Sequence, residues 1–374
     1  MRKITIQQWE KKYLIGEVKR FDNKFTVPSR TQWDLELKNR IDDWGTDGGP
    51  NPKPGHTLHD RALKYSARLT LNTGRPVGNV QSAPGVNVPQ TPENAGFDIN
   101  DLKNNTRKIK KAALYFGADM VGICKLDRRW VYANEEIPEN FKYIIMLAYE
   151  KDYDLLRYSP SYISEVPGNM AYTQMSVTNA HLAAYIENLG FKALDCQNDT
   201  ALSIPLAMQA GLGELGRMGL LITPKYGPRV RLSKIITDLP LIIDSPIEFG
   251  VTKFCDKCKK CARLCPSQSI SYNSRTAEPN NVSNNKGTLK WPVNLETCRI
   301  YWARAKRYCS ECVACCPYNK PYTWPHRTAL WLTDHLSFAD SLYVKMDDLL
   351  GYGKPRKTDK FWEEWRPRKK AVPK

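Results

Sequence analysis

The sequence predicts a mixed α/β (α+β) core followed by a smaller cysteine-rich unit. Helical and strand-like patterns alternate between residues 101 and 250, as expected for a mixed fold. Closely spaced cysteines then occupy residues 251–320. The chain has 374 residues, 41% of them hydrophobic, and is therefore long enough to bury a large core. We expect four segments, which are residues 1–100, 101–250, 251–320 and 321–374.

The first of these segments is predicted to wrap over the core rather than to form a compact domain. Glycine, proline and asparagine concentrate in residues 44–50 and 72–96. These residue types favour turns and loops. The last segment is also expected to lie back over the core, and it carries Trp324, Trp331, Trp362 and Trp365.

The core segment contains recognisable starts and stops of helices and strands. Asp101 is a suitable N-cap for a helix, and Gly190 is a suitable residue to end one. Runs of apolar residues with the length of buried strands lie between these two points and beyond them. The predicted elements are a helix over 101–116, strands over 118–126, 143–149 and 239–243, and a helix over 179–189.

Eight cysteines form two blocks whose spacing is typical of bacterial ferredoxins. The first block reads Cys255-x2-Cys258-x2-Cys261-x3-Cys265-Pro266. The second consists of Cys298 and then Cys309-x2-Cys312-x3-Cys316-Pro317. In this pattern thiolates hold 4Fe–4S clusters, and the last cysteine of each block crosses to the other cluster. Eight ligands are enough for two clusters.

The crossing rule divides the ligands between the clusters. We assign to cluster one Cys255, Cys258, Cys261 and Cys316. We assign to cluster two Cys265, Cys298, Cys309 and Cys312. Cys315 is an additional cysteine beside Cys316, while Cys124 and Cys196 stand in apolar surroundings and are expected to be buried thiols. Structural zinc and disulfides are the alternative uses of such cysteines.

A glycine motif between residues 211 and 216 resembles the dinucleotide fingerprint G-x-G-x-x-G. That fingerprint requires a strand before it and a helix after it. Here residues 204–210 look helical and residues 220–223 look like a strand, so the order is reversed. The glycines would permit either the close approach of a flat ligand or a tight turn. We take Gly211, Gly213 and Gly216 as candidate cofactor contacts.

The chain is strongly basic, with a formal net charge of +17. Such a charge suits nucleic acid, anionic lipid or an acidic protein. Part of it lies in the tail at 366–370, which we interpret as solvated, and we expect no nucleic-acid partner. The sequence has no apolar stretch of membrane-spanning length, and its start lacks the apolar core of a signal peptide.

Longer motifs resemble the corrinoid iron–sulfur reductive dehalogenases. They are Ser203–Arg217 (SIPLAMQAGLGELGR), Leu221–Leu232 (LITPKYGPRVRL), Phe249–Cys255 (FGVTKFC) and Leu350–Gly353 (LGYG). The resemblance runs from about residue 100 to residue 355. It implies a nitroreductase-like core that binds a base-off corrinoid, with an inserted ferredoxin-like unit carrying two 4Fe–4S clusters. None of the five histidines lies in the Asp-x-His-x-x-Gly run that would supply an axial ligand.

The resemblance also implies an activity and a set of site residues. Such enzymes replace a carbon–halogen bond by carbon–hydrogen in a small organohalide, during organohalide respiration. The family's proton-donating tyrosine matches Tyr172, its neighbouring arginine matches Arg231, and its substrate-placing asparagine matches Asn198. A small membrane-anchor protein is the usual partner. The resemblance places a mature, exported form on the outer face of the cytoplasmic membrane, in peripheral association.

Two other functions remain open at this stage. Epoxyqueuosine reductase, which acts on tRNA, is similar in using a corrinoid and two clusters, but it has aspartate where Tyr172 is the best match here. An electron-transfer subunit without chemistry of its own would leave the long core before residue 250 unexplained.

Overall fold

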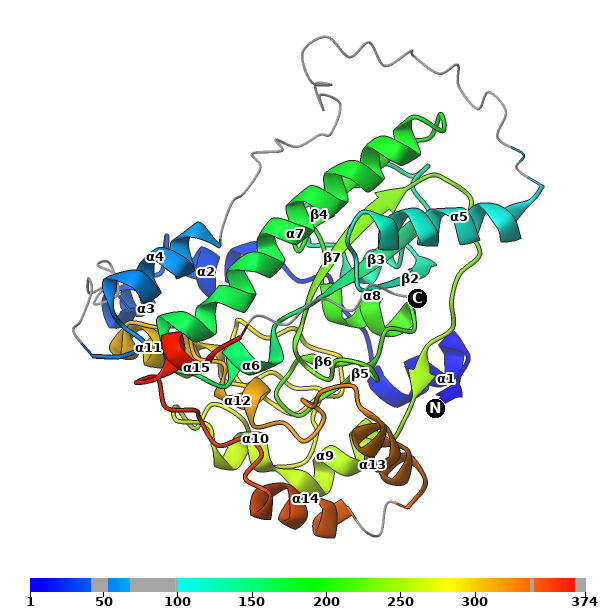
Figure 1. The fold of residues 1–374 in the computed structure, drawn as a ribbon. Helices are drawn as coiled ribbons and strands as arrows, with labels where there is room; N and C mark the ends of the chain where they lie inside the picture. Colours follow the sequence, from blue (N-terminus) through cyan, green and yellow to red (C-terminus); the bar gives the residue numbers. More distant parts are fainter. Residues whose placement is uncertain (42–52, 68–97, 99, 337–339, 367–374) are drawn as a thin grey trace.

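A computed structural model describes residues 1–41, 53–67, 98, 100–336 and 340–366 (Figure 1). The loops expected at 44–50 and 72–96 lie outside these described residues, as does most of the basic tail.

The core is built on a four-stranded sheet in which every neighbouring pair of strands is antiparallel. Its strands, in spatial order, are β2 (Met120–Lys125), β3 (Tyr143–Glu150), β7 (Val230–Thr237) and β4 (Ala193–Gln197). Two short pairs lie outside it, β1 (Arg2–Lys3) with β8 (Ile247–Glu248) and β5 (Glu214–Leu215) with β6 (Leu221–Ile222). The predicted strands at 118–126 and 143–149 are confirmed.

The strand predicted at 239–243 is wrong, because the strand in this region is β7. Pro240 has no amide hydrogen to donate to a sheet ladder, which disfavours a strand through it. Leu239 and Leu241 are nevertheless buried against the core. The apolar run therefore reflected burial rather than strand pairing.

Helices cover both faces of the sheet (Figure 1). On one face α5 (Leu102–Tyr115) and α7 (Tyr162–Glu187) bury apolar side chains against β3 and β7. On the other face α1 (Ile6–Tyr13) and α8 (Ser203–Gln209) share a core cluster with β2 and β3. The predicted helix at 101–116 is confirmed, and Asp101 caps it by accepting from the Asn104 amide at 3.2 Å.

Helix α7 is much longer than the helix predicted over 179–189. It begins after Ser161, whose side chain and that of Ser164 form a reciprocal cap. Pro167 lies in its second turn, where few intrahelical hydrogen bonds are lost. Because the first half is buried on several sides, it lacks the one-sided pattern that marks an amphipathic helix. The predicted end at Gly190 is confirmed by its positive φ of 85°.

Short helices from the first segment pack on these layers. They are α2 (Val27–Arg30), α3 (Leu35–Ile41) and α4 (Leu58–Ser66). Helix α4 lies against α7, where Asn169 Nδ2 donates to Lys64 O and Thr173 Oγ1 donates to Ala67 O, each at 3.0 Å. The segment before residue 68 is thereby fastened to the longest helix of the core.

The cysteine-rich unit and the last segment contain only helices and loops apart from isolated bridges, as far as the structure describes them. The helices are α9 (Val251–Cys258), α10 (Lys260–Arg263), α11 (Leu295–Ala305), α12 (Glu311–Ala314), α13 (Trp324–His335), α14 (Asp340–Leu349) and α15 (Phe361–Glu364).

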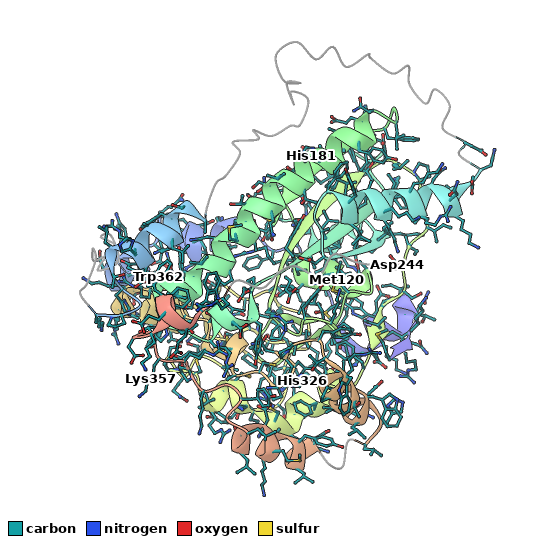
Figure 2. The ribbon with its side chains drawn as sticks, viewed as in Figure 1. Met120, His181, Asp244, His326, Lys357 and Trp362 are labelled. Atoms are coloured by element: carbon teal, nitrogen blue, oxygen red, sulfur yellow. The ribbon has the colours of Figure 1, made fainter. Side chains whose placement is uncertain are left out.

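Two contacts hold the last segment in place. The buried Lys260 amine donates to Asp347 Oδ2 at 2.6 Å and fixes α14 on α10. Trp362, labelled in Figure 2, donates through Nε1 to Asp60 Oδ1 at 2.9 Å and fixes α15 on α4. Trp324 and Trp331 are instead exposed on α13.

Gly122 in β2 offers a test of the packing between the sheet and α8. A Cβ at this position would lie 2.2 Å from Ala210 O. We expect Gly122→Ala to destabilise the protein by about 1–3 kcal/mol, because backbone would have to move. Thermal unfolding followed by circular dichroism checks this. Gly168→Ala is the matched control, because no atom lies within 4 Å of its Cβ position. It should stabilise α7 by about 0.5–1 kcal/mol, and equal shifts of the melting temperature would contradict the packing argument.

Candidate functional site

Tyr172 and Arg231 meet on one face of the central sheet. Tyr172 lies on α7, and Arg231 lies near the start of β7. The Arg231 guanidinium carbon is 3.7 Å from the centroid of the Tyr172 ring. Both side chains are half-buried, so each has a surface from which a ligand could be reached. The structure thus brings together two residues that are 59 positions apart in the sequence.

Lys151 adds a second cation to this site. It follows β3, and its amide donates to Arg229 O at 2.8 Å, which continues the ladder between β3 and β7. Burial, and then the charge of Arg231, lowers the pKa of Lys151 to about 8, while the Cys312 thiolate favours its charged form. Lys151 is therefore influenced by the charge of Arg231 and by that of a predicted cluster ligand, Cys312.

Asn198 lies on the exposed turn after β4. Lys234, which is fully buried, holds this turn against β7 by donating to Gln197 O at 3.3 Å and Asp199 O at 2.7 Å. Lys234, which holds the turn, lies three residues after Arg231 in β7. Asn198 itself is positioned by its neighbours, and its contact with a substrate remains a prediction.

The first set of predicted cluster ligands surrounds one small cavity. Cys255, Cys258, Cys261 and Cys316 all line it. Burial raises the pKa of Cys255 to about 12, and that of Cys258 to about 11. The pKa of Cys316 lies well above its ordinary value, first through burial and then because the three other sulfurs are close enough to oppose its charge. Four thiolates here need a positive group to be stable.

The sulfurs of the second set also influence one another's charge. Burial, and then the Cys298 and Cys265 sulfurs, raises the pKa of Cys312 to about 12. Burial, and then the Cys309 and Cys265 sulfurs, raises the pKa of Cys298 to about 12. Each set therefore draws one member from the other block of the sequence.

The remaining three cysteines are also buried. Cys315 is 2% exposed, and a Cβ at Gly353 would be only 2.7 Å from its Cα. The predicted burial of Cys124 and Cys196 is confirmed, with exposed fractions of 3% and 4%. Nowhere in the described part of the chain do three His, Cys, Asp or Glu side chains gather in a group that could hold a metal ion. Among the same residues, no helix has both the length and the apolar character needed to cross a bilayer.

The glycine motif forms the β5–β6 hairpin, with the reversed order of elements that the sequence indicated. A Cβ at Gly213 would lie 2.2 Å from Ile222 O, and one at Gly211 would lie 2.5 Å from Ser245 O. One at Gly216 would lie 2.6 Å from the Ile222 side chain. All three glycines thus approach the chain's own atoms, and their contact with a cofactor remains a prediction.

Sequence reasoning missed the charged residues of this hairpin. Glu214 is buried and accepts from the amides of Phe249 at 2.6 Å and Val251 at 3.3 Å. Arg217 is also buried, and its Nε donates to Cys255 O at 2.9 Å. The one feature of the sequence that could have indicated Glu214 and Arg217 is their position within or directly after a glycine-rich motif. Lys151 and Lys234 were missed too, although a lysine at the end of or within an apolar strand is a comparable signal.

Comparison with known proteins agrees with this arrangement. No protein-family model matches the chain. The tetrachloroethene reductive dehalogenase of Sulfurospirillum multivorans is 33% identical over 329 residues, covering 78% of this chain. A tetrachloroethene reductive dehalogenase of Desulfitobacterium hafniense is 36% identical over 313 residues, covering 70% of this chain. The chain is thus similar in sequence to the reductive dehalogenases. It spans 65% and 57% of the lengths of these relatives, which is less than two thirds of either.

Solved structures agree on the fold. The catabolic reductive dehalogenase NpRdhA superposes with a TM-score of 0.74 at 24% identity, over 95% of this chain and 49% of the other. A reductive dehalogenase described in terms of B12-dependent dehalogenation has the same TM-score and identity, over 97% of this chain and 50% of the other. The epoxyqueuosine reductase of Lactococcus garvieae is 26% identical over 122 residues, which is 32% of this chain. The alternative function is therefore not favoured.

The buried amine of Lys151 predicts a pH-dependent stability. Its pKa is about 8 in the folded chain, and an unfolded lysine holds its proton to about pH 10.4. Below pH 8 the folded protein bears the cost of a buried charge, and this cost falls as the pH rises from 8 to 10. We expect Lys151→Met to raise the free energy of unfolding at pH 7 by up to about 3 kcal/mol.

Melting temperatures measured at pH 7, 8, 9 and 10 check this expectation. The advantage of Lys151→Met should shrink steadily across the series. Lys108→Met, on the exposed face of α5, is the control and should show no such trend. An advantage that stays constant with pH would contradict the assignment of a low pKa to Lys151.

Proposed function

We propose that this chain is the catalytic part of a reductive dehalogenase, which replaces a carbon–halogen bond by carbon–hydrogen. The reaction consumes two electrons and one proton and releases halide. The observation that carries this proposal is the contact between Tyr172 and Arg231, at 3.7 Å from ring centroid to guanidinium. The similarity to tetrachloroethene reductive dehalogenases supports the same reaction.

Tyr172 is the proton donor in this proposal. A free tyrosine has a pKa near 10, so it is protonated at neutral pH but gives up its proton slowly. The Arg231 charge beside the ring stabilises the phenolate that remains after donation. Arginine suits this position because it does not lose its own charge at any working pH. Asn198, on the turn held by Lys234, would help to place the organohalide.

Four other large aromatic residues of the chain are buried. Trp130 and Trp291 are each 1% exposed, and Tyr162 is fully buried. Tyr158 is 7% exposed and packs against Phe361 with ring centroids 5.2 Å apart. Their placement agrees with core packing, which is the commoner use of such residues.

We place a corrinoid on the open side of the Tyr172–Arg231 pair, where both side chains are only half-buried. When bound, a cobalt corrinoid supplies strongly reducing electrons to a carbon–halogen bond. The residues of this chain would orient the substrate, exclude water and supply the proton. The glycine motif would approach the corrinoid only through backbone atoms, because the side-chain directions of Gly211, Gly213 and Gly216 are filled by the chain itself. We infer the base-off form, in a nitroreductase-like core, from the similarity to the reductive dehalogenases. The lack of a histidine in an axial-ligand motif is compatible with this form.

Two 4Fe–4S clusters would bring the electrons. The cavity lined by Cys255, Cys258, Cys261 and Cys316 supports cluster one. The electrostatic coupling of Cys312 to Cys298 and Cys265 supports cluster two, in a ferredoxin-like unit. Lys151 interacts electrostatically with both Cys312 and Arg231. We therefore place cluster two nearer to the catalytic pair than cluster one.

We also infer a peripheral association with the outer face of the cytoplasmic membrane, through a small anchor protein. The formal charge of +17 would add attraction to anionic lipid headgroups.

Tyr172→Phe tests the proton donor. We expect halide release from the cofactor-loaded protein to fall by about 10²–10⁴-fold, because a general acid contributes about that much. The assay is anaerobic halide release from a panel of chlorinated alkanes, alkenes and phenols, driven by reduced methyl viologen. Tyr115→Phe, at a side chain 86% exposed on α5, is the matched control and should leave the rate unchanged. Full activity in Tyr172→Phe with unchanged iron and cobalt content would exclude Tyr172 as the acid.

Cys258→Ala tests the assignment of cluster one. A chain with two clusters holds about eight irons, and loss of a ligand should remove or degrade one cluster of about four. Iron analysis and the electron paramagnetic resonance of the reduced protein measure this. Cys196→Ala removes another buried thiol and should retain all of the iron. Equal iron content in the two variants would show that Cys258 is not a ligand.

A further inference from the structure

We propose that a cationic cavity beside cluster one is the docking site of an acidic electron-carrier protein. The inference rests on the proposed function, because it needs cluster one as the first electron acceptor. The cavity has a volume of about 400 Å³, and its lining includes Arg217, Lys259, Arg275, Asp256 and Tyr272. Nothing in the catalytic site uses these residues.

The cavity lies directly against the first cysteine block. Asp256 and Lys259 line it and are sequence neighbours of Cys255 and Cys258. Arg217 donates to Cys255 O at 2.9 Å and lines both this cavity and the cavity formed by the four cysteines of cluster one. The two cavities thus share a wall. A donor seated in the outer cavity would be close to cluster one.

The cavity carries positive charge that the described part of the chain does not neutralise. Arg217 donates to four backbone carbonyls, those of Cys255, Ser271, Asn273 and Asp256, and stacks on Trp291, but these groups carry no negative charge. Lys259 and Arg275 form no ion pair with any described residue. Asp256 is the one carboxylate among the lining residues that the structure describes.

Arg275 supplies an additional indication of a missing anionic partner. Its Nη1 atom is buried and has no hydrogen-bond acceptor within the described residues. A buried guanidinium nitrogen without an acceptor costs free energy, which a carboxylate would recover. Its guanidinium lies 5.6 Å from the Trp291 ring and is thereby oriented. A carboxylate side chain entering the cavity would meet Arg275 and Lys259 together.

The location favours a redox protein over a free anion. The cavity and the pocket of cluster one share Arg217 and Lys259 in their linings, so a donor seated in the cavity would pass its electron to cluster one first. Cys258, the ligand of cluster one next to Lys259, is partly exposed. An acidic carrier would be attracted by the charge of the cavity, and carboxylates around its cofactor would orient it. Each docking event would pass one electron, so two carriers would be oxidised for each carbon–halogen bond replaced.

Reduced flavodoxin, an acidic flavoprotein, is the probe. Stopped-flow absorbance follows the reduction of the clusters in the loaded full chain at low and high ionic strength. We expect Lys259→Glu with Arg275→Glu to slow this reduction by about tenfold or more at low salt. Added salt should slow the reduction of the clusters in the wild type, and it should reduce the difference in rate between the wild type and the double variant. Lys108→Glu with Lys111→Glu is the matched control, because both lysines are exposed on α5, away from α9 and α10 (Figure 1). It makes the same change in net charge and should leave the rate within about twofold.

Turnover driven by reduced methyl viologen separates docking from folding and from the proposed function. Iron content and viologen-driven halide release should be retained in the Lys259/Arg275 variant if only docking is lost. Equal slowing in both double variants, or no slowing in either, would overturn the docking site and leave the proposed function standing. Slowing by free phosphate without any effect of the two substitutions would also overturn it. Absence of 4Fe–4S signals in the wild type would overturn the proposed function, and the docking site with it.

Discussion

The β5–β6 hairpin holds the two halves of the molecule together through two buried charges. Glu214 accepts from amides at the start of the cysteine-rich unit, and Lys12 of α1 approaches it at 3.1 Å. Arg217 binds carbonyls on both sides of the same unit. Burying a charge without partners costs several kcal/mol. These partners are available only when the core, α1 and the cysteine-rich unit are all in place, so the hairpin favours one arrangement of the three.

A second set of contacts joins the first segment to the catalytic helix. Asn169 and Thr173, on either side of Tyr172 in sequence, donate to carbonyls at and just after the end of α4. Arg229, fully buried, links the start of β7 to the chain after the cysteines by donating to Lys320 O at 2.8 Å. The supports of Tyr172 and Arg231 therefore come from opposite ends of the chain. The position of the pair depends on the whole fold rather than on one local motif.

The sequence predicted those features that local chemistry specifies. The cysteine blocks have a fixed spacing because a cubane needs four converging thiolates, and the four cysteines assigned to cluster one line one cavity. Asp101 marks a helix start because its side chain accepts a hydrogen bond from an amide in the first turn. Gly190 marks a helix end because glycine readily adopts the positive φ that is needed there. The pair formed by Tyr172 and Arg231 came from resemblance to a family, since no short-range pattern connects residues so far apart.

The features that were missed depend on tertiary contacts. The first half of α7 has apolar and polar residues on several sides, because it is surrounded by other parts of the chain. Strand β7 carries two charged residues, and its Lys234 is buried because its amine donates to carbonyls at the end of β4 and just after it. The glycine motif has the residue pattern of a dinucleotide-binding fingerprint. In the structure its glycines instead allow the chain to pack closely against Ser245 and Ile222. In each case burial, rather than local preference, decided the structure.

The contact between Gly353 and Cys315 has a consequence for biosynthesis. Gly353 has a positive φ of 81° and lies so close to the Cys315 backbone that no side chain would fit. During translation the cysteines emerge from the ribosome before the segment that covers them. Under the proposed function, a maturation machinery would therefore have a limited period for inserting clusters, which opens when Cys316 has emerged and closes when Gly353 docks.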